Sequence, residues 1–339
     1  MTSRERVLCA LQRGTPDRVP YCEVGVSNRV MLGLWGDAPN EGIIGGIDEM
    51  DQRGPEQEAA ISQTLGRDHI CFRVHPPVPV ERQVGADGVS FYGEGLVKSR
   101  RDLSRVALPD PEGEAVWGGV EAFMAQAGDY ATCLATRVGV SPVYLAMGTE
   151  AFAVALYGDP GLVEAVLELY TGWAEKVVRK GMALGFDFIW TADDLAYRTG
   201  PLMSPRMFRD LFLPRMRKVA DSISIPWVFH SDGNLAELMP DLLDLGISGI
   251  NPVEPEAMDI VAAKRRWGDQ ICLLGNVSVH LLSAGSPGEV RAEVRRLLRE
   301  VAPGGGYILT SGNSLASYCR PENVRAMVET LQEYGAYPL

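Results

Sequence analysis

The amino-acid sequence predicts an α/β protein that folds as one (β/α)8 barrel over residues 1–339. Short apolar runs, often rich in β-branched residues, alternate with longer amphipathic runs, which is the pattern of parallel strands covered by helices. Eight such units fit a chain of 339 residues, and no low-complexity segment, internal repeat or linker divides it. A doubly wound open sheet is the alternative arrangement of the same units.

The expected strands are short apolar runs bounded by turn-forming residues. In chain order they cover residues 19–24, 69–74, 131–138, 186–191, 225–230, 249–252, 271–275 and 306–310. The alternation breaks at about 76–109, where residues 81–95 indicate a hairpin with a glycine-rich turn. We expect this hairpin to be an insertion after the second strand that partly covers the mouth of the barrel.

The expected helices are longer runs in which apolar residues recur at helical spacing. They cover residues 4–13, 48–65, 115–127, 149–156, 162–184, 205–221, 235–245, 257–267, 287–301 and 321–334. The first of them is an N-terminal extension before the first strand. Ser204, Ser286 and Arg320 each precede a proline, which suits the first helical position because its missing N–H would have no partner there.

Composition restricts the class of partner. The formal net charge is −12 and the sequence pI is about 4.9, which argues against nucleic acid and against an anionic membrane surface. The six cysteines form no Cys-x-x-Cys pair and most lie in apolar stretches, so we expect reduced thiols. Without the apolar segment of a signal peptide or an apolar run of about 18 residues, the chain is expected to be soluble and cytoplasmic.

The segment 227–234, WVFHSDGN, is an apolar run that ends in two potential metal ligands. Side chains alternate in an extended chain, so His230 and Asp232 should point to the same side. Gly233 then permits a sharp turn, and Asn234 can cap a following helix. The alternative interpretation is a buried histidine with a hydrogen-bonded neighbour and an aspartate that caps the helix.

Other polar side chains follow neighbouring strands, where a barrel builds its active site. Either Asp193 or Asp194 should enter the site while the other caps a turn. Glu254, between two prolines, is a candidate ligand or acid/base group. His230, Asp232 and Glu254, with Asp193 or Asn313, would form a nitrogen and oxygen site for Zn²⁺ or another divalent ion. The further candidates for contact with a substrate are Glu23, His75, Tyr197, Asn251, Asn276 and Asn313.

Several motifs in this order resemble the uroporphyrinogen decarboxylase superfamily, whose members are (β/α)8 barrels, and above all its cobalamin-linked methyltransferase branch. They are RERV at 4–7, PDRVP at 16–20, DDLAYRTGPLMSP at 193–205, FLP at 212–214, HSDGN at 230–234, GNV at 275–277, GGYIL at 305–309 and PENV at 321–324. The resemblance covers nearly the whole chain.

The sequence differs from the family pattern at two places that help to decide which branch it resembles. Decarboxylases of this superfamily have an arginine-rich segment near the N-terminus that meets the carboxylates of the substrate, whereas residues 21–29 contain one arginine, Arg29, and the acidic Glu23. In the branch that methylates a thiol, zinc is held by a His-x-Cys pair and a later cysteine. His230 matches that histidine, but Asp232 and Asn313 stand at the cysteine positions, which makes a harder site and argues against coenzyme M as substrate.

The resemblance implies methyl transfer between a small methoxy, amine or thiol compound and a corrinoid. A metal at His230 and Asp232, or a proton from Asp193, Asp194 or Glu254, would neutralise the leaving atom. The chain has no Asp-x-His-x-x-Gly motif, so the cobalamin would come from a separate corrinoid protein. A homodimer is expected by analogy. The alternatives are a cofactor-free decarboxylase and a non-catalytic binding barrel.

Overall fold

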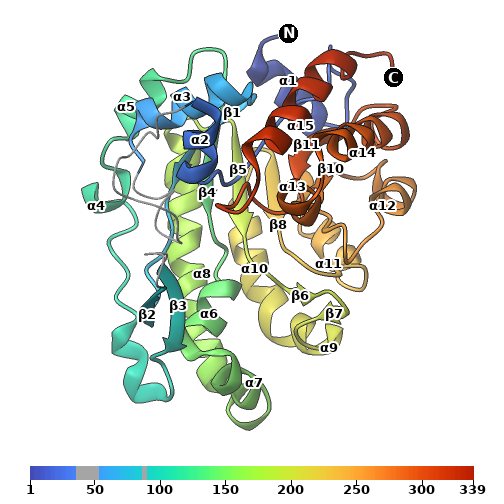
Figure 1. Ribbon diagram of the computed structural model, residues 1–339. Coiled ribbons are helices and arrows are strands. Elements are labelled where there is room, and N and C mark those ends of the chain that lie inside the picture. Colours follow the sequence, from blue (N-terminus) through green and yellow to red (C-terminus); the bar gives the residue numbers. More distant parts are fainter. Residues whose placement is uncertain (36–52, 86–89) are drawn as a thin grey trace.

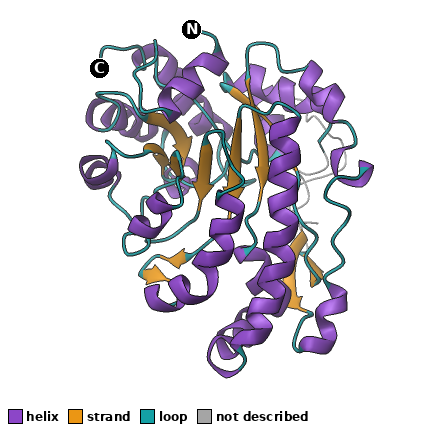
Figure 2. Cartoon of the chain, turned by 180° about the vertical axis from the view of Figure 1, so that it is seen from behind, coloured by secondary structure: helices purple, strands orange, loops and turns teal. Residues whose placement is uncertain are grey.

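The computed structural model describes residues 1–35, 53–85 and 90–339, and its centre is a curled parallel sheet surrounded by helices (Figures 1 and 2). The sheet has seven strands in the order β1-β4-β5-β8-β9-β10-β11, and each pairs with its neighbours in parallel. The strands are β1 His69–Arg73, β4 Ala131–Thr136, β5 Phe188–Ala192, β8 Trp227–His230, β9 Gly249–Asn251, β10 Cys272–Val277 and β11 Tyr307–Ser311. The predicted class of parallel strands covered by helices is therefore confirmed.

The predicted first strand, residues 19–24, is not a regular strand. Its backbone nevertheless meets both edges of the sheet: Leu309 N donates to Pro20 O at 2.9 Å, and Asp68 N donates to Tyr21 O at 2.8 Å. Cys22 N adds a bond of 3.1 Å to Leu309 O. Pro20 has no N–H to give to a ladder, which explains why an apolar run that looks like a strand forms only an isolated bridge with β11.

Helices cover the outside of the sheet, and most begin and end near the predicted limits (Figure 1). Of the predicted helix 48–65, residues 48–52 lie outside the described part, and α3 begins at Pro55. The predicted helix 235–245 is shorter, because α11 begins at Met239 with a proline in its first turn. The helices are α1 Ser3–Leu11, α2 Asn28–Trp35, α3 Pro55–Leu65, α4 Glu114–Trp117, α5 Val120–Ala125, α6 Val140–Met147, α7 Thr149–Gly158, α8 Pro160–Ala183, α9 Pro205–Met207, α10 Leu213–Ala220, α11 Met239–Asp244, α12 Ile260–Trp267, α13 Val279–Ala284, α14 Pro287–Glu300 and α15 Pro321–Tyr334.

Two of the three helix starts predicted from proline carry a side-chain cap. The Ser204 and Ser286 hydroxyls accept backbone N–H bonds at the starts of α9 and α14. Within the described residues, no single helix is long and apolar enough to cross a membrane. α6 and α7 reach that length and composition only together, with a bend of 104° between them.

Between β1 and β4 the chain forms the antiparallel pair β2 Val80–Val84 and β3 Ser90–Gly95, in the region where the sequence predicts a hairpin. Residues 86–89 of the predicted turn lie outside the described part. β3 packs directly on the end of α6: a Cβ built at Gly95 would lie 2.2 Å from Gly148 N, so only glycine fits there. This close approach sets the hairpin against the C-terminal end of α6.

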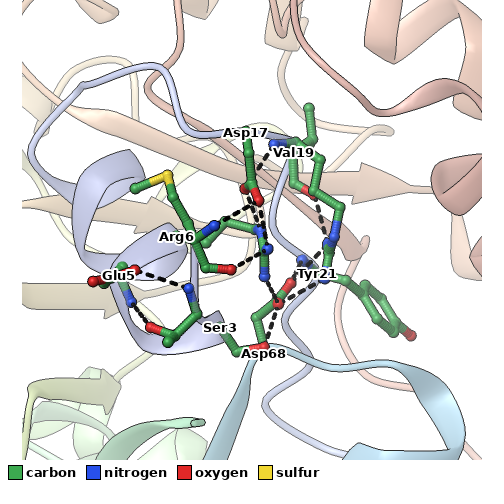
Figure 3. A network of polar contacts seen from close by, with 10 residues as sticks. Ser3, Glu5, Arg6, Asp17, Val19, Tyr21 and Asp68 are labelled. Carbon is green, nitrogen blue, oxygen red and sulfur yellow. Dashed lines mark hydrogen bonds and ion pairs between the residues drawn. The ribbon is translucent and has the colours of Figure 1, made fainter.

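Asp68, fully buried just before β1, is the centre of a charged network (Figure 3). Its carboxylate accepts hydrogen bonds from Arg6 at 2.7 Å and from both terminal nitrogens of Arg18 at 2.8 and 2.9 Å. It also accepts from the Ser3 hydroxyl at 2.8 Å and from Tyr21 N at 2.9 Å. One carboxylate thus ties the N-terminal helix and the segment between the two sheet edges to β1.

We expect Asp68→Asn to lower the free energy of unfolding by about 3–5 kcal/mol, because it leaves the buried Arg6 guanidinium with less compensating charge. The control is Asp17→Asn: Asp17 also pairs with Arg6 but is 42% exposed, so its loss should cost about 1 kcal/mol or less. Urea denaturation followed by tryptophan fluorescence measures both. Equal losses in the two variants would contradict the central role of Asp68.

Candidate functional site

Three potential ligands meet at the C-terminal ends of β5 and β8. These strands pair so that Ala192 lies beside His230, which brings Asp194 close to the imidazole. His230 Nε2 lies 3.9 Å from Asp194 Oδ1 and 3.7 Å from Asp232 Oδ1. One ligand atom from each of these residues lies within 4.8 Å of the others.

His230 is held so that one ring nitrogen faces the two carboxylates. Its Nδ1 lies 2.6 Å from Asn251 Oδ1, and an amide oxygen can only accept, so Nδ1 carries the hydrogen. The Asn251 amide is oriented in turn by Nδ2, which donates to Thr310 Oγ1 at 3.2 Å and to Leu274 O at 3.5 Å. In the neutral imidazole the lone pair then lies on Nε2, on the side of the two carboxylates, as a metal-binding histidine requires.

Asp232 has one oxygen engaged and one without a partner. Oδ2 accepts a hydrogen bond of 2.5 Å from Asn313 Nδ2, whereas Oδ1 is shielded from solvent and has no hydrogen-bond partner. Burial, together with the nearby charges of Asp194 and Glu254, raises the pKa of Asp232 to about 6, although His230 acts to lower it. An unpartnered carboxylate oxygen that faces an imidazole lone pair needs a cation or a proton between them. One nitrogen and two carboxylates suit zinc or another divalent ion.

The two aspartates after β5 lie in different environments. Asp193 is fully buried, and its oxygens accept backbone N–H bonds from Val138, Gly139 and Ser141 at 2.5–3.3 Å at the start of α6. Asp194 lies half-exposed beside His230, and its Oδ1 also accepts from Asp232 N at 3.0 Å. The Asp193 carboxylate is thus engaged at the start of α6, whereas Asp194 belongs to the group, and an acid role for Asp193 stays a prediction.

Glu254 lies outside the three-residue group, although the sequence suggests it as a ligand. Its Oε2 accepts a hydrogen bond of 2.6 Å from Gly233 N. Gly233 has φ +85°, and a Cβ there would lie 2.5 Å from the Ala196 carbonyl, so the turn after Asp232 requires glycine. Glu254 thus supports the loop that presents Asp232.

Two candidates for substrate contact make structural bonds instead. Glu23 is fully buried, and its carboxylate accepts from Ser311 N and Ser311 Oγ, each at 2.7 Å. Asn276 is buried and donates from Nδ2 to Val253 O at 2.7 Å. Val253 has φ +52°, a strained value for a β-branched residue, so this bond helps to hold the loop after β9.

A polar pocket of about 250 Å³ opens beside the group. It contains the predicted residues His75 and Asn313 together with His230 and the two aspartates. Sequence analysis missed Arg73, Tyr92 and Arg137, which line the same pocket. Arg137 directly follows β4, but the predicted strand extends to residue 138, so Arg137 is not at its predicted end.

A second, more apolar cavity of about 370 Å³ adjoins the first. Asp194 and Asp232 line both, so the site has two lobes that meet at this carboxylate pair. Tyr197, 58% exposed, belongs to this apolar lobe and not to the polar one. The other residues that line it are Tyr144, Thr149, Phe152, Ala153, Leu156, Ala196 and Leu202.

Comparison with known proteins gives one family. The uroporphyrinogen decarboxylase (URO-D) family model matches residues 95–334. A methylcobamide:CoM methyltransferase of Methanosarcina barkeri is 31% identical over 176 residues, which cover 52% of this chain and 50% of that protein, so the match spans about half of its length. A uroporphyrinogen decarboxylase of Methylococcus capsulatus is 24% identical over 256 residues, 70% of each chain.

Among solved structures, a methyltransferase from Methanosarcina mazei superposes with a TM-score of 0.76 at 22% identity. The superposition covers 98% of this chain and 99% of that one. At this level of identity the likeness establishes a shared fold over essentially the full length.

The role of Asn251 leads to a test. We expect Asn251→Leu to weaken Zn²⁺ affinity about 10- to 100-fold, because His230 loses the acceptor that keeps its hydrogen on Nδ1. Competition with a chromogenic chelator measures the affinity. The control, Asn234→Ala, removes an asparagine of the neighbouring turn whose side chain bonds only locally, to Ala236 N. Unchanged zinc affinity in Asn251→Leu would show that Asn251 does not orient the ligand.

Glu23 leads to a pH-dependent test. Burial raises its pKa from 4.5 to about 8, although the Ser311 donors and Arg67 act to lower it. Because the folded-state pKa is the higher one, the contribution of Glu23 to stability is fully present below about pH 4.5 and is lost as the pH rises toward 8.

Glu23→Gln stays neutral at every pH. Relative to the wild type, its free energy of unfolding should therefore rise between about pH 5 and about pH 9 by on the order of a few kcal/mol. Urea denaturation at both pH values measures this difference, in which all other titrating groups cancel. A difference that does not change with pH would mean that Glu23 has the same pKa in the folded and unfolded chains.

Proposed function

The chain belongs to the uroporphyrinogen decarboxylase family, and from its site we propose that it is a corrinoid-dependent methyltransferase. It would move a methyl group between a small molecule and a cobalamin carried by a partner protein. The observation that carries this proposal is the group of Asp194, His230 and Asp232 at the junction of two lobes, with one ligand nitrogen and one carboxylate oxygen left free. The likeness to methyltransferases supports it.

The metal proposal assigns a divalent ion to these three residues. When bound, the metal would supply Lewis-acid activation of the heteroatom that gains or loses the methyl group, and the corrinoid would supply the cobalt that exchanges it. Asn251 accepts the hydrogen of His230 Nδ1, so that Nε2 is the ring nitrogen offered to a metal, and Asn313 holds Asp232 so that Oδ1 faces the imidazole. Both positioning bonds are present before any ligand enters.

The two lobes suit a transfer between two reactants. Methyl transfer by displacement needs the incoming and the leaving atom on opposite sides of the carbon, and here one lobe lies on each side of the carboxylate pair. The polar lobe would take the small molecule. The apolar lobe, lined by Phe152, Leu156 and Leu202, would exclude water from the reacting carbon.

A decarboxylase that acts on uroporphyrinogen fits the polar lobe less well. A tetrapyrrole with eight carboxylates would have to extend from this lobe of about 250 Å³ into the apolar lobe of about 370 Å³, whose described lining has two aspartates and no cation. Among the described residues, the arginines that line the lobe are Arg73 and Arg137. Glu23, on the N-terminal segment, points into the protein and bonds Ser311.

The test uses purified protein loaded with Zn²⁺, cob(I)alamin or methylcobalamin, and a panel of methoxy, amine and thiol compounds. We expect a substrate-dependent change in the cobalamin absorbance, which His230→Ala lowers about a hundredfold or more. The matched control is His280→Ala, which removes an exposed histidine of α13 outside the site and should leave the rate unchanged.

Two results would replace the proposal. Turnover of uroporphyrinogen with no change in the cobalamin spectrum would assign the chain to cofactor-free decarboxylation. Absence of metal binding together with silence in both assays would favour a non-catalytic binding barrel.

A further inference from the structure

Arg137 is a half-buried cation of the polar lobe that serves no visible structural purpose. It directly follows β4 and lines the lobe together with His75 and Tyr92. Within the described part of the chain it makes no hydrogen bond and no ion pair. Arg73 in the same lobe differs, because it donates to Val24 O at 2.8 Å and to Glu58 at 3.3 Å. Partial burial of a cation without a partner costs free energy, which a bound ligand would offset.

The acid group that interacts electrostatically with Arg137 is Asp193. That carboxylate already accepts three backbone N–H bonds at the start of α6. Its oxygens form no ion pair with Arg137 in the described structure, so the guanidinium remains available on the side of the lobe. Asp193 is therefore stabilised by these backbone N–H groups and does not account for the presence of Arg137.

The balance of charge in the lobe favours an anion at this end. A divalent ion would neutralise Asp194 and Asp232, and Arg73 binds Glu58, which it shares with the buried Arg67. Arg137 then remains as the arginine of the lobe that no carboxylate binds within the described part of the chain. A guanidinium matches a carboxylate with two parallel N–H donors, a geometry that a lysine cannot offer.

We propose that the small molecule handled by this site carries one anionic group, a carboxylate or similar oxyanion, and that Arg137 binds it while the methyl-bearing atom faces Asp194, His230 and Asp232. This inference rests on the proposed function and adds the substrate class. It excludes compounds whose only charge is a cationic amine. Tyr92 of β3, stacked with Arg82 at 5.1 Å, forms the wall beside the anion.

The test measures binding by calorimetry on the zinc-loaded protein, without corrinoid or turnover. Its probes are two matched pairs, methoxyacetate with methoxyacetamide and 3-mercaptopropionate with 3-mercaptopropionamide. In the wild type we expect the acid of each pair to bind about tenfold more tightly than the amide. Arg137→Gln should remove this preference, and Arg137→Lys should keep part of it.

The control is Arg101→Gln, which removes the same charge from an exposed turn that does not line the lobe and should keep the full preference. Since Arg137 has no partner in the described structure, the thermal midpoint of Arg137→Gln should be unchanged or raised. A marked fall in the midpoint would reveal a structural role and contradict the proposal.

Two binding results would overturn the inference. A preference for the acid that persists in Arg137→Gln would mean that the metal, not Arg137, binds the carboxylate. Equal binding of acid and amide in the wild type would mean that the lobe does not select anions. If methyl transfer fails but Arg137→Gln still loses the preference, the proposed function falls while the anion site stands.

Discussion

The edge strands β1 and β11 of the curled sheet are joined by residues 19–24, which do not form a regular strand. Hydrogen bonds to buried charged side chains replace the backbone bonds that a strand would make there. Pro20 breaks the pattern of backbone donors, so Tyr21 N bonds the Asp68 side chain instead. Arg67, also buried, reaches Glu23 O at 3.1 Å, and Glu23 in turn holds Ser311 at the end of β11. The pocket depends on this closure, since Val24 and Gly25 of the same segment line it.

The candidate site also depends on polar side chains that hold their neighbours in place. Hydrogen bonds hold the side chains around it in place: Asn251 bonds His230, Asn313 bonds Asp232, and Glu254 bonds Gly233. His230 Nε2 and Asp232 Oδ1 face each other at 3.7 Å, and Oδ1 has no hydrogen-bond partner. The proposed metal site rests on this rigid arrangement of supporting bonds.

Sequence patterns predict those parts of the fold that depend on local periodicity. The strands, most helices and the side-by-side position of His230 and Asp232 follow from apolar runs and from alternation. Alternation stops where a strand stops, however. β5 ends at Ala192, so no period decides which of Asp193 and Asp194 faces the pocket.

Contacts between distant segments determine the side-chain directions that local periodicity does not predict. Glu23 bonds Ser311, 288 residues away, and Glu254 follows a residue with φ +52°, so neither side chain could be directed from its neighbours in sequence. Arg137 follows a strand as the site residues do, but an arginine there looks like surface until the pocket is known. Its lack of a partner appears only in three dimensions.

The hairpin places one wall of the pocket on an element outside the central sheet. Tyr92 belongs to β3, whereas His230 ends a strand that is hydrogen-bonded on both sides. Changes in the hairpin need only preserve its packing on α6, whereas a change at the end of β8 disturbs two neighbouring strands. The wall of the pocket that the hairpin supplies can therefore diverge between related proteins much faster than the end that holds His230.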